Sequence, residues 1–233
     1  MTAIYIVLSL GVLVGLYFIL PYWPRNYLRR KFLRAIKESG FVCLTFDDGP
    51  NPESTPEILD LLEELDVKAT FFLTGRNIQK HPELYQDIIK HDHEVGEHGY
   101  RHVHPWGCLP FSAVKDLIRG STAIKEENRG KNSFWLRLPY GKLNLITLCY
   151  VLLYRRKLAF WNVDPRDYLP QTPEQLSASV LTHFKGGSVI LLHETSLHTN
   201  ESTKGNLVAI KMIVQEIQKR GYTFATVSQA IRE

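Results

Sequence analysis

The chain has 233 residues, of which 44% are hydrophobic and 22% are charged, and its formal net charge is +4. The positive charge is confined to residues 1–40, which carry six cations and one anion, so residues 41–233 are close to neutral and offer no basic face for nucleic acid. The three cysteines, none in a CxxC spacing, exclude a disulfide framework and a cysteine zinc site; they are Cys43, Cys108 and Cys149.

Residues 1–24 contain no charged side chain and are almost entirely apolar. About 20 helical residues span a hydrocarbon core of roughly 30 Å, so this stretch is long enough for one transmembrane helix. A cleaved signal peptide is the alternative, but no basic stretch precedes the apolar run and no small-x-small site follows it. Tyr22 and Trp23 are placed like interfacial aromatic residues. We therefore predict an uncleaved single-pass anchor over residues 1–24.

Residues 25–40 are predicted to form a basic juxtamembrane segment. Its cations suit the headgroups of anionic membrane lipids, or they only fix the topology of the anchor, and the two roles are compatible. Because the cations follow the span, the positive-inside rule favours a domain that faces the cytoplasm, with an exported domain as the alternative. The cations are Arg25, Arg29, Arg30, Lys31, Arg34 and Lys37.

Residues 41–233 are sufficient for one domain, in which strand-like runs alternate with helix-like runs. The first helix opens at Thr55-Pro56-Glu57, where a capping residue precedes a proline in the first turn. Strands are predicted at residues 40–46, 68–74, 93–96, 134–138, 158–163, 188–192 and 222–227. Helices are predicted from residue 55, behind Pro82, around residues 114–118, over residues 143–154, from residue 172 and over residues 210–217.

Seven strands that alternate with helices predict an α/β fold, a distorted, compact or incomplete (β/α) barrel behind one transmembrane helix. An open doubly wound sheet is the alternative, although the chain has no GxGxxG loop to support it. Residues 143–154 are too apolar for an ordinary surface helix and too short to span a membrane. They indicate either a buried core helix or a helix that docks on the membrane beside the anchor, with Arg155, Arg156 and Lys157 at the headgroups.

Asp47 and Asp48 stand side by side where the first predicted strand ends and Gly49-Pro50 turns the chain. Two adjacent carboxylates repel each other, so this placement indicates a bound cation, with a solvated Asp-Gly turn as the alternative. His98 and His102 are four residues apart, a spacing that places both imidazoles on one side of a helical turn. They follow the third strand, and a barrel brings that strand end beside the first.

Two imidazoles and one carboxylate predict a zinc-type catalytic site with one position left for water, which leaves the second carboxylate free to act as a base. Three more polar segments fall at strand ends, and each alone has an ordinary structural reading as a surface cation, a capping residue or a core histidine. Polar clusters at five strand ends together indicate an active site. The three segments are Arg137-Leu138-Pro139-Tyr140, residues 164–168 and Leu191-Leu192-His193.

In this order the five segments resemble the motifs of the polysaccharide deacetylase family, which is carbohydrate esterase family 4 with its NodB-homology domain. The resemblance covers residues 41 to about 227 and implies a distorted barrel that removes an acyl group from an amino sugar with the help of a metal. The first two motifs read Thr45-Phe46-Asp47-Asp48-Gly49-Pro50 and His98-Gly99-Tyr100-Arg101-His102.

The resemblance implies that Asp48, His98 and His102 are the metal ligands and that Asp47 is the general base. The metal it implies is zinc, although cobalt, nickel and manganese accept the same ligands. On the same basis, Arg137 keeps Asp47 ionised, and Asp167 raises the pKa of His193. The oxyanion would lie against the Tyr140 backbone N–H, and His193 would protonate the departing amine.

The sequence departs from the family pattern at two positions. Gly99 stands where serine or threonine is common, which predicts a poorly braced loop and a lower metal affinity. Tyr168 stands where tryptophan is usual, which predicts a smaller and wetter apolar wall beside His193.

The expected substrate is an N-acylated, most often N-acetylated, amino sugar of a glycan or a lipid-linked saccharide. The alternatives are a deacetylase or deformylase of lipid- or nucleotide-linked sugars on the cytoplasmic face, an amidase for a non-sugar amide, and a catalytically silent carbohydrate-binding protein. A catalytically silent protein on this fold would be expected to lack Asp47, a metal ligand or His193, and this sequence retains all of them. The expected partners are this substrate and membrane lipids, and no nucleic acid.

Overall fold

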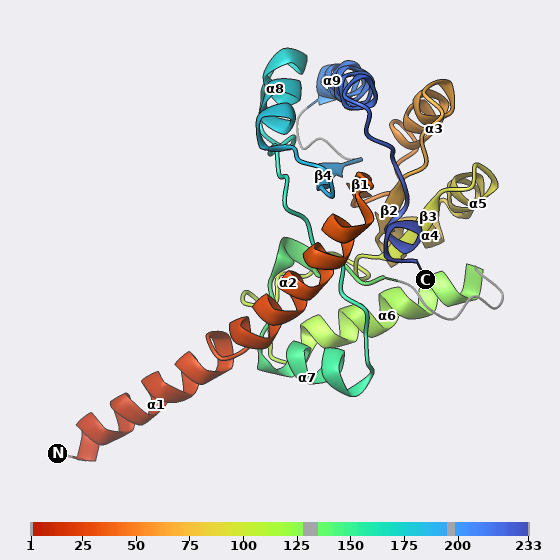
Figure 1. The fold of residues 1–233 in the computed structure, drawn as a ribbon. Coiled ribbons are helices and arrows are strands. Elements are labelled where there is room, and N and C mark those ends of the chain that lie inside the picture. Colours follow the sequence, from red (N-terminus) through yellow and green to blue (C-terminus); the bar gives the residue numbers. More distant parts are fainter. Residues whose placement is uncertain (1, 128–134, 195–198, 233) are drawn as a thin grey trace.

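The computed structural model describes residues 2–127, 135–194 and 199–232. Figure 1 shows a body of strands surrounded by helices, from which the N-terminal helix projects. Within these residues, four strands form a parallel sheet in the order β3-β2-β1-β4. They are β1 Cys43–Asp47, β2 Thr70–Leu73, β3 Glu94–Glu97 and β4 Val189–His193.

The other three predicted strands are reduced, within the described residues, to isolated parallel bridges. Leu136 bridges to both Glu97 and Leu158, and Val163 bridges to Ile190, which connects β3 back to β4. The last predicted strand, residues 222–227, is reduced to a bridge between Phe224 and Val42, the residue that precedes β1. Because parallel pairing continues around the whole circuit, the predicted distorted (β/α) barrel is confirmed and the open doubly wound sheet is not formed.

Local chemistry explains why the fourth and fifth predicted runs do not become regular strands. Pro139, which follows the fourth run, has no N–H to donate to a neighbouring strand. In the fifth run the side chain of Asn162 takes a place in the ladder, since its Oδ1 accepts the Val189 N–H at 2.7 Å. The start of the fourth predicted strand, residue 134, lies outside the described residues.

The helices begin close to the positions that the capping residues indicate. Proline occupies the first turn of α3, α5 and α8, and Thr172 and Gln175 form a reciprocal capping box at the start of α8. Figure 1 shows α3, α8 and α9 above the strands and α6 and α7 below them. The helices are α1 Thr2–Phe18, α2 Tyr22–Ser39, α3 Thr55–Glu64, α4 Gly75–Lys80, α5 Pro82–Lys90, α6 Ser112–Glu127, the 3-10 turn η1 Pro139–Gly141, α7 Leu145–Leu153, α8 Pro173–His183, α9 Thr199–Lys219 and α10 Val227–Ile231.

Strand β1 connects the hydrophobic core to the polar interior of the barrel. Its residues alternate between the two faces of the sheet, as in any strand. Leu44 and Phe46 join the core cluster that the strands share with α3 and α9. Thr45 and Asp47 therefore point the other way, where both contact Arg137. This alternation is what directs a charged side chain inward from a fully buried strand.

The N-terminal segments behave differently from each other. Helix α1 is largely exposed, and the region Ile4–Ser39 is, among the described residues, long and apolar enough by length and composition to cross a membrane. The predicted basic segment folds as α2 and packs on the domain, because Phe32 and Ile36 are buried in the second core cluster. A domain boundary at residue 41 stays a prediction, although the packing of the domain extends back to Phe32.

Candidate active site

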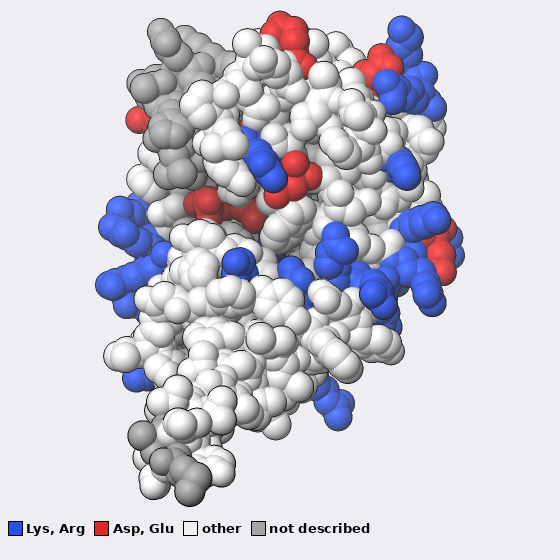
Figure 2. All heavy atoms as spheres, turned by 90° about the vertical axis from the view of Figure 1, so that its left-hand side faces the viewer, with Lys and Arg blue, Asp and Glu red and all other residues white. Residues whose placement is uncertain are grey.

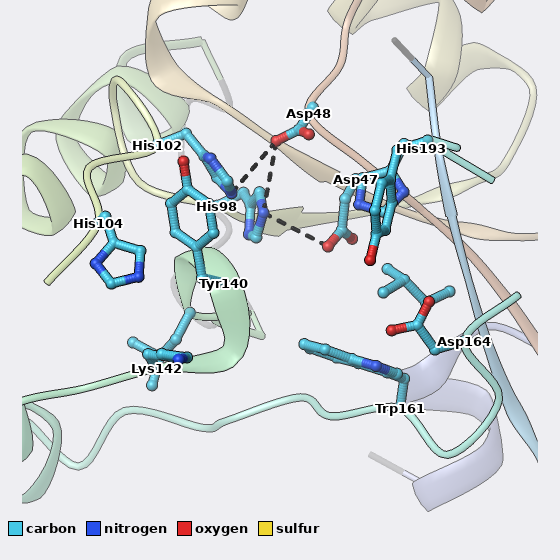
Figure 3. Close-up of a pocket in the computed structure, with 13 residues that line it drawn as sticks. Asp47, Asp48, His98, His102, His104, Tyr140, Lys142, Trp161, Asp164 and His193 are labelled. Carbon is cyan, nitrogen blue, oxygen red and sulfur yellow. Dashed lines mark ion pairs between the residues drawn. The ribbon is translucent and has the colours of Figure 1, made fainter. Parts of the chain in front are cut away.

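The five polar segments meet at one end of the barrel around a cavity of about 550 Å³. Asp47 is the last residue of β1, His193 is the last residue of β4, and His98 directly follows β3. Figure 3 shows these side chains pointing toward one another. Of the site residues predicted from the sequence, the cavity wall includes Asp47, Asp48, His98, His102, Tyr140 and His193. Arg137 and Asp167 lie behind this wall, each bound to one of its members.

Asp48, His98 and His102 form a set that could hold a metal ion. Their nearest ligand atoms all lie within 4.8 Å of one another. The Asp48 Oδ1 atom is 3.6 Å from the His98 Nε2 atom and 3.7 Å from the His102 Nε2 atom. This Oδ1 atom is buried and has no hydrogen-bond partner among the described residues. A buried carboxylate oxygen left without a partner, facing two imidazole nitrogens, fits a divalent metal.

The protonation states of these residues suit metal binding. His98 Nδ1 lies 2.8 Å from the backbone oxygen of Arg137, so Nδ1 carries the hydrogen and the Nε2 lone pair faces Asp48. Burial lowers the pKa of His98, and it lowers the pKa of His102 to about 4. Both rings are therefore neutral near pH 7, the form in which imidazole binds a metal. Burial also raises the pKa of Asp48, and the adjacent Asp47 adds to this rise.

Asp47 is held in an ion pair that lies inside the barrel. The Arg137 Nη1 donates to Asp47 Oδ1 at 2.7 Å and to Thr45 Oγ1 at 2.8 Å. The guanidinium also lies over the Phe72 ring, 4.0 Å from its centroid. Burial alone would raise the pKa of Asp47, but the attraction of Arg137, with smaller contributions from His98 and His193, holds it below its ordinary value. Asp47 is therefore an ionised carboxylate at neutral pH.

His193 is the opposite case, a histidine that keeps its proton. Its Nδ1 lies 2.8 Å from Asp167 Oδ1, and its backbone N–H donates to Asp167 Oδ2 at 2.6 Å. Burial would lower the pKa of His193, but the hydrogen bond and charge of Asp167 outweigh it and raise the pKa to about 9. The two bonds also fix the ring, so its Nε2–H is directed away from Asp167. The cavity is thus bordered by an ionised carboxylate and a protonated imidazole.

Tyr140 has an unusual backbone at the rim of the cavity. It lies inside η1 with a φ of 57°, in the left-handed region that few non-glycine residues adopt. Its ring lies against His102, with centroids 4.4 Å apart, and against His104, with centroids 4.6 Å apart. These contacts join the loop after β3 to the turn that follows Leu138.

The loop that carries His98 and His102 is braced by a residue that sequence reasoning missed. The Asp116 carboxylate accepts the backbone N–H groups of Tyr100 and Arg101, both at 2.9 Å. Gly99 has a φ of 75°, and a Cβ there would lie 2.7 Å from Asp116 Oδ2. The expectation of a poorly braced loop is therefore wrong in its physical premise, because the Asp116 carboxylate occupies the space that a hydroxyl-bearing side chain at residue 99 would need.

The second departure, Tyr168, lines the cavity and meets the His193 ring edge-on at a centroid distance of 5.6 Å. Further lining residues that were not singled out as site residues include His104, Lys142, Trp161 and Asp164. Figure 3 shows His104 and Lys142 on one side of the cavity and Trp161 and Asp164 on the other. Trp161 falls within a predicted strand, and Lys142 and His104 lie outside the motifs, so only Asp164, at the start of the fourth motif, carried a sequence signal.

Comparisons with known proteins agree with this site. Residues 35–153 match the family model described as polysaccharide deacetylase. The chain is 31% identical over 193 residues to a peptidoglycan-N-acetylglucosamine deacetylase of Bacillus cereus, covering 82% of this chain and 88% of that protein. It is also 31% identical over 188 residues to a chitooligosaccharide deacetylase of Bradyrhizobium, covering 78% and 86% respectively.

The fold agrees as well. A crystal structure of a peptidoglycan N-acetylglucosamine deacetylase in complex with 4-naphthalen-1-yl-N-oxidanyl-benzamide superposes with a TM-score of 0.76 at 30% identity, covering 83% of this chain and 88% of the other. The barrel, the grouped aspartates and histidines, and these matches together show that the chain belongs to the polysaccharide deacetylase family and is a hydrolase of amino-sugar N-acetyl groups.

Proposed function

We propose that the chain removes the acetyl group from N-acetylglucosamine units, with Asp48, His98 and His102 as metal ligands and Asp47 as the general base. The observation that carries this assignment is the pairing, in one cavity, of a carboxylate whose pKa is lowered with a histidine whose pKa is raised to about 9. Environments that drive two titratable groups apart in this way are typical of acid–base catalysis. The names of the two curated relatives support N-acetylglucosamine as the sugar.

Asp48, His98 and His102 would hold a divalent metal, which would supply Lewis-acid chemistry to the acyl group and the water; zinc is the first choice, with cobalt, nickel or manganese as alternatives. Asp47 accepts the proton of the water whose oxygen bonds to the acyl carbon. The backbone N–H of Tyr140 donates to the carbonyl oxygen as negative charge develops on it. His193 gives its proton to the nitrogen as the carbon–nitrogen bond breaks, so the products are acetate and a free amine.

The cavity wall supports a sugar as the bound group. Trp161, Tyr168 and Tyr140 give it flat apolar surfaces, while the carboxylates and histidines form its polar floor. Apolar surface with a few fixed polar groups is how proteins orient small ligands. Arg29 holds this wall from outside, since its Nη2 donates to the Trp161 backbone oxygen at 3.0 Å.

The deciding experiment measures amine release from N-acetyl chito-oligomers by the purified full-length chain, before and after chelation and after zinc is restored. We expect chelation to abolish release and zinc to restore it, and we expect Asp47→Asn to lower turnover by about 10²–10⁴-fold. Asp60→Asn, the same substitution at an exposed position of α3, is the matched control and should leave the rate unchanged. Release that survives both chelation and Asp47→Asn would refute the mechanism, and sugar binding without any release would favour the silent alternative.

We further propose that α1 anchors the chain in a membrane with the domain on the cytoplasmic side. The support is the apolar character of α1 and the cations that follow it. Cysteine labelling in intact cells tests this, with Glu57→Cys on α3 introduced after Cys108 and Cys149 have been replaced by serine. A membrane-impermeant maleimide should leave Glu57→Cys unlabelled until the cells are opened. Labelling of intact cells would place the domain outside, where peptidoglycan is the accessible substrate.

A further inference from the structure

We propose that the domain does not hang freely from α1 but rests on the bilayer surface, so that the catalytic cavity opens at the level of the lipid headgroups. The contact surface is made of five exposed side chains, here called the apolar rim: Leu109, Phe111, Leu152, Leu153 and Tyr154. This inference rests on the proposal that α1 is a membrane anchor.

The end of α1 is fixed to the domain by aromatic contacts. Trp106 packs edge-on against Phe18, at a centroid distance of 5.6 Å, and against Tyr22, at 5.9 Å. The indole N–H of Trp106 donates to the backbone oxygen of Leu143 at 3.0 Å. Trp106 therefore lies between the last turn of α1, the first turn of α2 and the segment that leads into α7.

The start of α2 is fixed as well. The Arg25 Nε donates to the backbone oxygen of Gly141 at 2.8 Å, and the Arg29 Nη2 donates to that of Trp161 at 3.0 Å. Since Gly141 belongs to η1 and Trp161 lines the cavity, α2 is held by the segments that build the active site. The orientation of α1 relative to the cavity is consequently set by packing on both sides of the α1–α2 junction.

The apolar rim lies on two segments that pack beside this junction. Leu109 and Phe111 follow Trp106 and are 78% and 64% exposed, and Leu153 at the end of α7 is 79% exposed. The Asn144 side-chain amide joins the two segments by donating to the Pro105 backbone oxygen at 2.9 Å. Figure 1 shows α7 on the lower edge of the body, with α1 leaving at the lower left, away from α3, α8 and α9. Large apolar side chains at this exposure mark an interaction surface.

The charge pattern of these segments selects a lipid surface as the partner. Neither residues 104–111 nor residues 145–157 contain an aspartate or glutamate, and Arg155 is exposed next to the apolar rim. The exposed aromatic residues Trp23 and Tyr27 follow α1, as expected where a helix leaves the hydrocarbon core. Apolar side chains with flanking cations match the layered structure of a membrane that contains anionic lipids.

The cavity opens on the same side. His104 and Lys142 line it from segments that also hold Trp106, because the Trp106 backbone N–H donates to His104 Nδ1 at 3.2 Å and the Lys142 ammonium lies 4.3 Å from the Trp106 ring centroid. Figure 2 shows acidic side chains in a hollow of the face from which the N-terminal helix projects, with lysine and arginine side chains around it. The class of substrate that this placement favours is an N-acetylated amino sugar attached to a membrane lipid.

The test uses the full-length chain in vesicles of phosphatidylcholine and phosphatidylglycerol, with Cys108 and Cys149 replaced by serine. One introduced cysteine that carries a fluorescent label replaces Leu109, Leu153, Leu10 in α1 or Glu57 in α3 in turn, while the buried Cys43 is kept. Lipids with a nitroxide on the acyl chain serve as quenchers. We expect quenching at Leu109, Leu153 and Leu10 and none at Glu57. Quenching at Leu10 alone would overturn the resting contact and leave the anchor intact. No quenching at Leu10 would overturn the anchor and the inference together.

A second copy of the chain is the competing occupant of the apolar rim. It would protect the labels at Leu109 and Leu153 from lipid and would make their fluorescence depend on the protein-to-lipid ratio, which would overturn the proposal. A functional readout completes the test. Leu153→Asp should lower kcat/KM for an N-acetylglucosaminyl lipid in vesicles about tenfold, because a membrane contact of one leucine is lost. The rate on soluble chito-oligomers should be unchanged, and an equal loss on both substrates would contradict the inference.

Discussion

Arg137 and Asp47 form an ion pair whose guanidinium is completely buried and whose Nη1–Oδ1 distance is 2.7 Å. Removing one partner of such a pair leaves an uncompensated charge in the barrel, at a typical cost of about 3–5 kcal/mol. The pair therefore connects the stability of the fold to the ionisation of the proposed base. Four predictions concern this pair and the residues around it.

Arg137→Met should raise the pKa of Asp47, because the largest opposing effect to its burial is lost. The acid limb of the pH dependence of kcat/KM, where the base becomes protonated, should then move to higher pH. In the unmodified protein, a carboxylate with a lowered pKa stabilises the fold above its unfolded pKa, and this contribution is lost as the pH falls through its folded pKa. Arg137→Met should lack this contribution, so its free energy of unfolding near neutral pH should be lower. Thermal unfolding at several pH values measures this. An acid limb that stays in place in a folded variant would contradict the role given to Arg137.

Asp167→Asn should lower the pKa of His193, because the carboxylate that raises it to about 9 is gone. The alkaline limb of the kcat/KM profile, where the acid loses its proton, should shift from about 9 toward the ordinary histidine range. The stability contributed by this pair is present below the ordinary histidine pKa and is lost as the pH rises through about 9. Asp164→Asn is the control, because the Asp164 side chain accepts from the Arg166 N–H and not from His193. An alkaline limb that moves equally in both variants would mean that general cavity charge sets it.

His98→Ala and Asp47→Asn should separate metal binding from catalysis. His98→Ala removes a ligand, so metal content and activity should fall together. Asp47→Asn removes the base and should keep the metal while turnover drops by about 10²–10⁴-fold. Metal analysis of the purified variants beside their rates gives the answer. Equal metal loss in both variants would show that Asp47 is itself a ligand. The Asp47 Oδ2 atom lies 3.5 Å from His98 Nε2, close enough for this outcome to be tested.

Asp116→Ala should weaken the metal site without touching a ligand. The loop from Tyr100 to His102 would lose the acceptor of two backbone N–H groups. Supporting residues of this kind typically change metal affinity by about 10–100-fold. Gly99→Ser should act in the same direction, because a side chain in that left-handed position would collide with Asp116. Zinc titration with a competing chelator measures both, and Glu126→Ala near the end of α6 serves as a control. Unchanged zinc affinity in both test variants would show that the loop needs no such support.

Much of the barrel and of the site could be predicted from the sequence, because the signals were local. The apolar run ending in Asp47-Asp48 and the prolines at the starts of α3, α5 and α8 each indicate structure within a few residues. The reduction of three strands to single bridges could not be predicted in this way. It depends on which neighbour fills each ladder position, as when Asn162 bonds to Val189.

Contacts between residues far apart in the sequence could not be predicted either. Asp116 lies on α6 and braces a loop that is 15 residues earlier in the chain. Arg25 and Arg29 looked like headgroup cations, yet each bonds to a backbone oxygen more than 100 residues away. Such contacts are created by the folded barrel and leave no pattern in a single sequence.

The alternation of residues along β1 has a consequence for how genes of this kind can change. Phe46 faces the core while Asp47 faces the barrel interior. An insertion or deletion of one residue within this strand would therefore move the side chains that follow the change to the opposite face of the sheet. One residue gained before Phe46 would place that phenylalanine beside Arg137, whereas one residue lost there would move the Asp47 carboxylate into the hydrophobic core. Either shift would disrupt the core packing or the Arg137–Asp47 pair, so the length of this strand is constrained as strictly as the identities of its residues.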